Sequence, residues 1–460
     1  MNTTTVVRDT RDRNRPHISN VSITEGPVWK GLLTFFFPIL LGTFFQQLYN
    51  TTDAVIVGQF VGKEALAAVG GGTAVYVNLL VGFFIGLSSG ASVIISQFYG
   101  ANNKTEVSRS VHTAITLSLA AGAVMTVAGS LASPLAMTLI DTPADIYAES
   151  VEYLRIYFYG MIPMFIYNMG AGILRAVGDS RSPFYILVAG CGANIVLDLL
   201  CVAVFHQGVA GAAWATVISQ AFSMLLIAAC LMHTKESYRL SLRNLSITPH
   251  LLRAMIKIGL PAGIQSVLYT ISNLIIQADV NMFGTTTIAA WAAYGRIDSI
   301  FWMTSNSFGV ALTTFSGQNY GAKLFNRLHS ATKNGLAMAC GAAILYCCLF
   351  WFIGRLFFQM FTTDKDVITI GMRMLHFLAP FFITYEPIEI LSGTIRGTGD
   401  SFIPMMITCF GVCVLRIVWL AVTIPIWPSI ITVIACYPVT WITTSVLFFI
   451  YYKRGKWLNR

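Results

Sequence analysis

Apolar residues occur in long continuous runs along this chain, and short polar or Gly/Pro-containing breaks separate the runs. A helix that crosses the hydrocarbon core of a bilayer needs roughly 20 such residues. The runs do not alternate between polar and apolar positions, which argues against membrane-spanning strands. The pattern therefore predicts an all-α membrane protein. It has twelve transmembrane helices, centred near Leu41, Phe84, Leu119, Pro163, Leu197, Met224, Leu268, Phe301, Leu345, Phe382, Cys413 and Thr440.

The composition narrows the class of protein further. Of 460 residues, 55% are hydrophobic and only 11% are charged, whereas a soluble domain carries about 25% charged residues. This excludes a soluble enzyme, a nucleic-acid-binding protein and a disordered scaffold. The nine cysteines all lie in apolar stretches without metal-ligand spacing, so we expect neither a disulfide framework nor a resident metal or cofactor.

The positive charges indicate the orientation. If both termini lie on one side, that side holds 22 of the 29 Lys and Arg residues and the other side holds five. Because cytoplasmic loops carry the excess of Lys and Arg, we expect a multi-pass protein of the cell (inner or plasma) membrane with both termini in the cytoplasm.

The chain repeats itself. Gln97-Phe98-Tyr99-Gly100-Ala101 recurs as Gln318-Asn319-Tyr320-Gly321-Ala322, and Arg175-Ala176-Val177-Gly178-Asp179-Ser180 recurs as Arg396-Gly397-Thr398-Gly399-Asp400-Ser401, both at an offset of 221 residues. Pro38 recurs as Pro261. We infer two homologous halves of six helices each. Because six spans return the chain to the side on which it started, the two halves have the same orientation in the membrane. We assign 1–29 to an N-terminal tail, 30–233 to an N-lobe, 234–257 to a linker, 258–453 to a C-lobe and 454–460 to a C-terminal tail.

Polar side chains inside the spans are candidate site residues, because an ionisable group at the bilayer centre costs about 2.5 kcal/mol or more. Asp53 shares a helix face with Gln46 and Asn50, with Tyr49 beside it, by their spacing. Asn194 and Asp198 are four residues apart on the fifth span. Together these oxygens could hold Na⁺ or share a proton. The alternative is that they only hydrogen-bond within the bundle.

The paired loops, the Pro38…Asp53 helix and the Asn194…Asp198 pair together resemble the multidrug and toxic compound extrusion (MATE) family over nearly the whole chain. The resemblance implies alternating-access export of cationic, amphipathic compounds by an H⁺- or Na⁺-coupled antiporter that is not an enzyme. It also implies that Thr216 faces the acidic pocket and that Pro38 bends the first helix when the pocket loads. An ordinary membrane-helix proline is the competing interpretation of Pro38.

The seventh span carries no acid in Ser266–Thr270, where other branches of the family place a coupling glutamate. This favours the DinF-like branch, with coupling in the N-lobe. The expected partners are small cationic substrates and membrane lipids, with no nucleic acid, and the expected state is a monomer.

The second half has its own charged residues within or near its spans: Asp279, Asp298, Glu386, Glu389 and Arg416. We expect Arg416 to pair with one of the four carboxylates, which would offset the cost of burying both charges. Structural ion pairing and recognition of a substrate cation are equally compatible with this set.

Two other functions were compared with export. Gly397-Thr398-Gly399-Asp400 matches the Gly-x-Gly-Asp pattern of intramembrane aspartyl proteases, but its duplicate at Gly178-Asp179 favours helix capping. A lipid or oligosaccharide flippase of the same superfamily is the stronger alternative. Its cavity would be expected to carry cationic residues for pyrophosphate, whereas the candidates here are mostly acidic.

Overall fold

The computed structural model describes residues 23–459 and shows helices without any strand over this range. The tail predicted for 1–29 and the last residue therefore lie largely outside the described residues. The elements in chain order are α1 (Val28–Phe60), α2 (Lys63–Gly70), α3 (Gly72–Gly100), α4 (Lys104–Leu139), α5 (Ala144–Tyr159), α6 (Met161–Ala176), α7 (Arg181–Asp198), η1 (Leu199–Val204), α8 (Gly208–His233), η2 (Leu242–Asn244), α9 (Pro249–Asn281), α10 (Thr285–Gly321), α11 (Phe325–Phe361), α12 (Lys365–Leu378), η3 (Ala379–Phe381), α13 (Phe382–Gly397), α14 (Phe402–Thr408), η4 (Cys409–Val414), α15 (Leu415–Thr423), α16 (Ile430–Ile434), α17 (Cys436–Lys453) and η5 (Lys456–Asn459).

These elements combine into the twelve predicted spans, several of which are interrupted. Within the described residues, ten helical stretches are long and apolar enough to cross a membrane. The two remaining spans are α10, which carries Arg296 and Asp298, and the pair α5 and α6, which is broken at Gly160. Charged residues lower the mean hydropathy of α10, and the break leaves α5 and α6 with only 16 residues each, too few for one helix to cross a membrane. The predicted all-α, twelve-helix membrane fold is confirmed.

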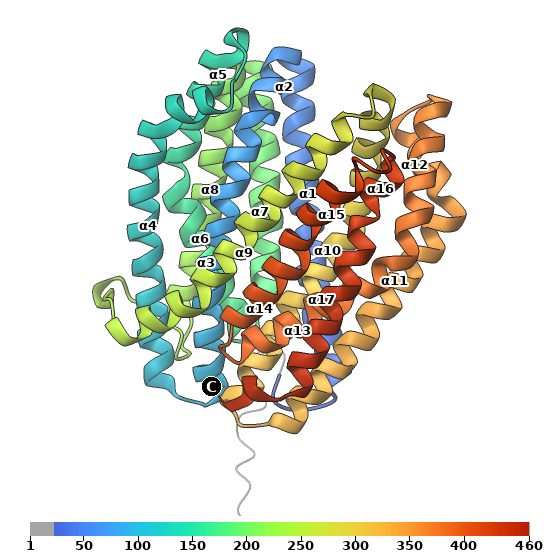
Figure 1. Ribbon diagram of the computed structural model, residues 1–460. Coiled ribbons are helices and arrows are strands. Elements are labelled where there is room, and N and C mark those ends of the chain that lie inside the picture. Colours follow the sequence, from blue (N-terminus) through green and yellow to red (C-terminus); the bar gives the residue numbers. More distant parts are fainter. Residues whose placement is uncertain (1–22, 460) are drawn as a thin grey trace, which may run out of the picture.

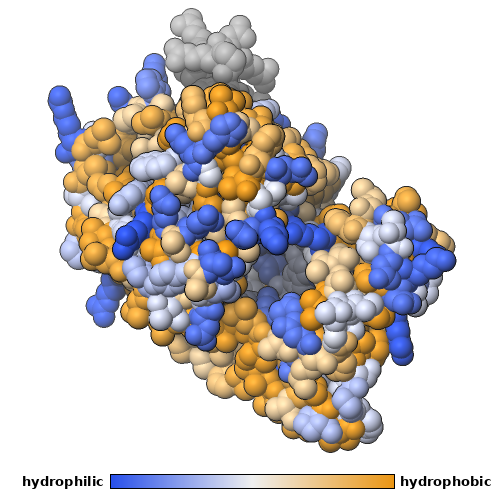
Figure 2. Space-filling view, turned by 90° about the horizontal axis from the view of Figure 1, so that it is seen from above, coloured by the Kyte–Doolittle hydropathy of each residue, from blue (hydrophilic) through white to orange (hydrophobic). Residues whose placement is uncertain are grey.

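The two halves of the chain form two lobes that stand side by side (Figure 1). Helices α1 to α8 make the N-lobe, in blue to green and mostly on the left, and α9 to α17 make the C-lobe, in yellow to red and mostly on the right. Helix α1 lies in the middle, and α9 runs diagonally from the lower left. We call the end at which the described chain starts and stops the lower end, and the opposite end the upper end. Figure 2 looks onto the upper end, where the surface is hollowed between the lobes and bordered by hydrophilic residues.

Helix α9 begins at Pro249, inside the segment 234–257 that the sequence assigns to the linker. A proline suits this first helical position because it lacks only an N–H that would have no partner there. Residues 234–248 form the connection, which contains the short helix η2.

The first helix of each half packs against the other lobe. The Phe36 ring of α1 stacks on Phe308 of α10, with ring centroids 4.0 Å apart. In the mirrored arrangement, α9 crosses α3 through glycines. A Cβ on Gly86 would lie 2.4 Å from the amide nitrogen of Gly263, and one on Gly90 would lie 2.2 Å from the carbonyl oxygen of Met255. The small-residue stripe of α3 therefore permits backbone-to-backbone contact between the lobes.

Candidate functional site

An acidic cluster lies inside the N-lobe where α1 meets α7. Asp53 of α1 is half-buried, whereas Asn194 and Asp198 of α7 are completely buried. The carboxyl groups of Asp53 and Asp198 are close enough to interact directly. Asp198 is the last residue of α7, and the chain continues as the π-helix η1. Such widened turns are common at functional sites, and here the turn directly follows the acid.

The polar atoms of this cluster lack protein partners to an unusual degree. Among the described residues, five buried atoms have no hydrogen-bond partner by distance and angle, apart from the contact between the two carboxyl groups themselves: one carboxyl oxygen of Asp53, both of Asp198, and the amide oxygen and nitrogen of Asn194. Buried polar groups in proteins are nearly always paired. Two carboxylates at this depth repel each other, and a proton or a cation that prefers oxygen ligands would relieve this repulsion.

A pair of hydroxyl groups forms one wall of the cluster. The Tyr49 hydroxyl donates to Thr216 Oγ1 at 3.4 Å, and the Thr216 hydroxyl donates to the carbonyl oxygen of Ala212 at 3.1 Å. Tyr49 also interacts electrostatically with Asp53 and Asp198. The structure thus brings together α1, α7 and α8 around the predicted residues Tyr49, Asp53, Asn194, Asp198 and Thr216.

Two tyrosines of α5, which the sequence analysis missed, border the same cluster. Tyr153 and Tyr157 both interact electrostatically with Asp53, and their rings stack with centroids 6.0 Å apart. Their spacing of four residues places them on one helix face. That spacing is a signal that could have been noticed, but the surrounding acids made this segment resemble a loop.

Three other predicted residues of α1 lie apart from the acidic atoms. Gln46 and Asn50 have exposed side chains, and within the described residues neither hydrogen-bonds to Asp53, Asn194 or Asp198. Pro38 lies inside α1, which continues through it without interruption. In this state the helix face predicted for the site contributes only Asp53 and Tyr49 to it.

The C-lobe holds a second set of buried carboxylates, and aromatic side chains surround them. The Asp298 carboxylate of α10 accepts a hydrogen bond from Trp302 Nε1. Glu386 of α13 accepts one from Ser305 Oγ at 3.1 Å, and Glu389 accepts one from the Tyr385 hydroxyl at 3.3 Å. The Trp302 and Tyr385 rings meet edge to face at 4.6 Å.

The ion pair expected for Arg416 does not form. Although Arg416 is only 2% exposed, its Nη1 donates to two neutral atoms, Ser272 Oγ and Asn273 Oδ1, each at 3.3 Å. Its central carbon lies 4.4 Å above the centre of the Tyr437 ring. Ion pairs are seen between Glu106 and both Arg109 and His250, whereas Arg416 lies beside neutral groups. Arg416 is thus stabilised by hydrogen bonds and an aromatic face, because no carboxylate of the C-lobe reaches it.

Asp279 stands apart from the other C-lobe acids. It is half-buried near the last turn of α9, and it interacts electrostatically with Cys436. Asp298 of α10 and Glu386 and Glu389 of α13 thus form one set, and Asp279 and Arg416 lie outside it.

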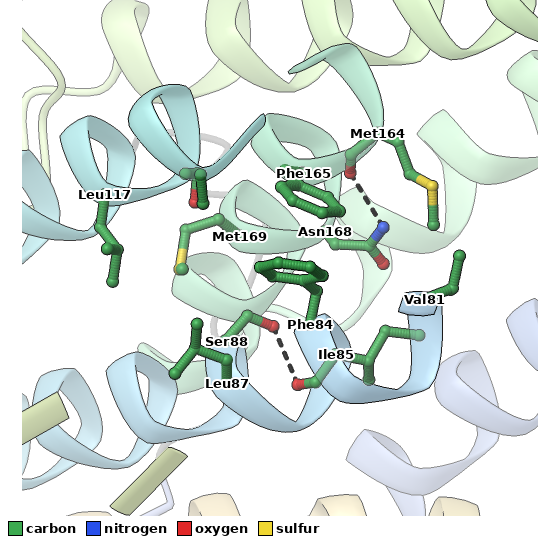
Figure 3. Close-up of a pocket in the computed structure, with 12 residues that line it drawn as sticks. Val81, Phe84, Ile85, Leu87, Ser88, Leu117, Met164, Phe165, Asn168 and Met169 are labelled. Carbon is green, nitrogen blue, oxygen red and sulfur yellow. Dashed lines mark hydrogen bonds between the residues drawn. The ribbon is translucent and has the colours of Figure 1, made fainter. Parts of the chain in front are cut away.

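A small cavity lies elsewhere in the N-lobe, between α3, α4 and α6 (Figure 3). Its volume is about 20 Å³, which is room for roughly one water molecule. Its polar side chains are already satisfied, since Asn168 donates to the carbonyl oxygen of Met164 at 2.9 Å and Ser88 donates to that of Ile85 at 3.1 Å. This cavity is too small and too apolar to receive a drug-sized cation.

Comparison with known proteins identifies the family. The MatE family profile matches residues 38–200 and 261–422, one match in each lobe. The chain belongs to the MatE family. Its members are transporters, so this protein is a multi-pass membrane transporter and not an enzyme.

Individual relatives agree with this assignment. This chain is 30% identical to the probable multidrug resistance protein YoeA of Bacillus subtilis, over 84% of each of the two chains. It is 26% identical to the probable multidrug resistance protein YpnP of the same organism, over 94% of this chain and 97% of that one. A solved structure described as the outward-facing conformation of a multidrug resistance MATE transporter shares the fold with a TM-score of 0.88, 22% identity, and coverage of 96% and 99%.

Proposed function

We propose that this MatE protein exports cationic, amphipathic drugs and toxic organic compounds in exchange for an entering cation, either H⁺ or Na⁺. The observation that carries the proposal is the group of five unpaired buried atoms on Asp53, Asn194 and Asp198. A purely structural cluster would satisfy its polar atoms internally, whereas a site that loads and releases a cation leaves them free. The names of the multidrug resistance relatives support the class of cargo.

The mechanism follows from the charge of this cluster. A cation or proton that arrives from the hollow at the upper end neutralises the Asp53–Asp198 pair. Helix α1 then bends at Pro38, where a backbone hydrogen bond is missing, and reshapes the N-lobe so that the cargo leaves. One charge that moves down the membrane potential contributes about 2.3 kcal/mol per 100 mV, enough for roughly a fortyfold gradient of cargo.

The proposal includes the orientation of the protein in the membrane and its oligomeric state. We place the lower end, which carries most of the Lys and Arg residues, in the cytoplasm, and the protein in the plasma membrane. The protein acts as a monomer, since α1, α5, α7 and α8 of one chain build the whole acidic cluster.

We assign the C-lobe carboxylates Asp298, Glu386 and Glu389 to recognition of the cargo cation. They are free for this role because Arg416 is bound elsewhere, and the neighbouring Trp302 and Tyr385 rings offer faces that attract organic cations. Asp279 and Arg416 then have positional roles only.

Efflux of ethidium from proteoliposomes tests the coupling. We expect Asp53→Asn and Asp198→Asn to lose at least about tenfold in cation-driven efflux, because the removed charge is what binds the cation. The matched control is Asp279→Asn, which removes an acid of the C-lobe and leaves efflux unchanged. Full efflux by both N-lobe variants at normal protein levels contradicts the proposal.

A second arm of the same assay identifies the cation. Efflux that persists without Na⁺ at a fixed pH gradient assigns H⁺ as the coupling ion, and efflux that stops assigns Na⁺. A lipid or oligosaccharide flippase would instead give a cell-envelope defect in cells that lack the protein, with dye retention unchanged.

A further inference from the structure

The duplicated Gln-x-Tyr-Gly-Ala motifs meet at the lower end, where the lobes are in closest contact. Gly100 ends α3 in the N-lobe, and Gly321 ends α10 in the C-lobe. A Cβ on Gly100 would lie 2.0 Å from the carbonyl oxygen of Gln318, and one on Gly321 would lie 1.9 Å from that of Gln97. Each motif therefore needs its glycine so that the other motif's backbone can touch it.

Each motif also sends a glutamine side chain into the opposite lobe. Gln97 Nε2 of α3 donates to the carbonyl oxygen of Gly397, the last residue of α13, at 2.9 Å. Gln318 Nε2 of α10 donates to the carbonyl oxygen of Ala176, the last residue of α6, at 2.7 Å. The offset of 221 residues relates the two donors, Gln97 and Gln318, and also the two acceptors, Ala176 and Gly397. The two bonds are thus copies of one contact, made once in each direction.

The acceptors explain why an amide is used. The carbonyl groups of a helix's last turn have no partner within the helix, so each glutamine satisfies one that the opposite lobe leaves open. Just beyond each acceptor the Arg-x-x-Gly-Asp-Ser loop turns through a glycine with positive φ, 95° at Gly178 and 100° at Gly399. These turns end α6 and α13 so that the last carbonyl faces the other lobe.

We propose that Gln97 and Gln318 form a two-point latch that holds the lower end closed while the upper end is open. This rests on the proposed alternating-access function and assigns a role to both duplicated motifs. Because donor and acceptor lie on different lobes, neither bond survives when the lobes part at the lower end. The latch sets the ratio of the two states and touches neither the cation nor the cargo.

Distance measurements between spin labels at the lower end test the latch on the full chain. Labels are placed on Lys104→Cys and Lys323→Cys, exposed positions of the two lobes, after replacement of the nine native cysteines. The starting chain should show mainly the short distance. Gln97→Ala and Gln318→Ala should each raise the long-distance population about threefold to tenfold, and the double variant should raise it further.

Two matched variants separate the latch from general packing. Gln97→Glu keeps the shape of the side chain but offers a carboxylate to a carbonyl oxygen, so it should open the lower end as Gln97→Ala does. Gln265→Ala removes an amide that bonds to Thr408 within the C-lobe, at 3.4 Å, and should leave the distances unchanged. If the double variant does not fold, the two single variants and Gln97→Glu carry the comparison.

The results separate the latch from the transport proposal. Unchanged distances in Gln97→Glu and in the alanine variants, in a chain that still exports ethidium, overturn the latch and leave the transport proposal intact. If the variants shift the distances but the unmodified protein exports no cationic dye, the latch stands and the proposed cargo is wrong.

Discussion

The N-lobe and the C-lobe are two copies of one six-helix unit, yet they bury their charges at different places. In the N-lobe the acids lie on α1 and α7, as Asp53 and Asp198. In the C-lobe the clustered acids lie on α10 and α13, as Asp298, Glu386 and Glu389, while Asp279 of α9 stands apart from them. The 221-residue offset relates Asp198 to Trp419 and Asn194 to Leu415, so the acidic cluster has no acidic counterpart at those C-lobe positions.

The C-lobe acids likewise have no acidic counterparts in the N-lobe. The same offset relates Glu386, Glu389 and Trp302 to Phe165, Asn168 and Val81, which line the small N-lobe cavity of Figure 3. The place that holds carboxylates in one lobe is therefore an apolar space in the other. The fold supplies two equivalent polar positions per lobe, and each lobe uses a different one. Under the proposed function, the N-lobe position would take a small cation and the C-lobe position an organic one.

The largest expected effect comes from giving the N-lobe the residue that the C-lobe has. Asn194→Leu should lower cation-driven efflux at least about tenfold if the amide is a cation ligand, and should also stabilise the fold by about 1–3 kcal/mol, because an unpaired buried amide is removed. Ethidium efflux and thermal unfolding of the purified variant measure the two effects. A loss of stability instead would mean that Asn194 is an ordinary structural residue.

A smaller effect is expected from neutralising the C-lobe acids. Glu386→Gln and Glu389→Gln should weaken binding of a cationic dye about threefold to tenfold, since the attraction to a partly desolvated cation is lost. Dye fluorescence titration measures this. Ser305→Ala is the control, because it removes the hydrogen bond to Glu386 and keeps the charge. Equal weakening in this control would show that the position of the side chain matters and its charge does not.

Arg416 should respond in stability more than in transport. Because no carboxylate neutralises it among the described residues, Arg416→Met should be neutral or stabilising by about 1–2 kcal/mol. Arg416→Lys should destabilise the protein by about 1–3 kcal/mol, since an ammonium group cannot match the planar contacts with Ser272, Asn273 and the Tyr437 ring. Thermal unfolding of the two purified variants measures both changes. Strong destabilisation of Arg416→Met would show that a carboxylate pairs with Arg416 after all.

The smallest effect is expected in the N-lobe cavity. Val81→Ile adds one methylene group next to a space of about 20 Å³ and should stabilise the fold by at most about 0.8 kcal/mol. Val93→Ile on the same helix α3, where Val93 is completely buried, should instead destabilise it by about 1–3 kcal/mol. Unfolding temperatures give both values. A change in the drugs exported by the Val81 variant would show that the cavity receives cargo.

The sequence alone determined the membrane class, the twelve spans and the two-lobe repeat. These follow from local quantities, since a long apolar run can satisfy its backbone in lipid only as a helix, and a duplicated motif keeps its spacing whatever the fold does. The sequence also selected Asp53, Asn194 and Asp198, because any polar residue inside such a run is conspicuous.

Only the tertiary structure decided which polar groups meet. It placed Tyr153 and Tyr157 beside Asp53, left Gln46 and Asn50 outside the cluster, and gave Arg416 neutral partners where an ion pair was expected. It also moved the start of α9 to Pro249 and joined Gln97 and Gln318 to the opposite lobes. Spacing fixes the face of a helix on which a residue lies, but the neighbouring helix that it meets depends on how the whole bundle packs.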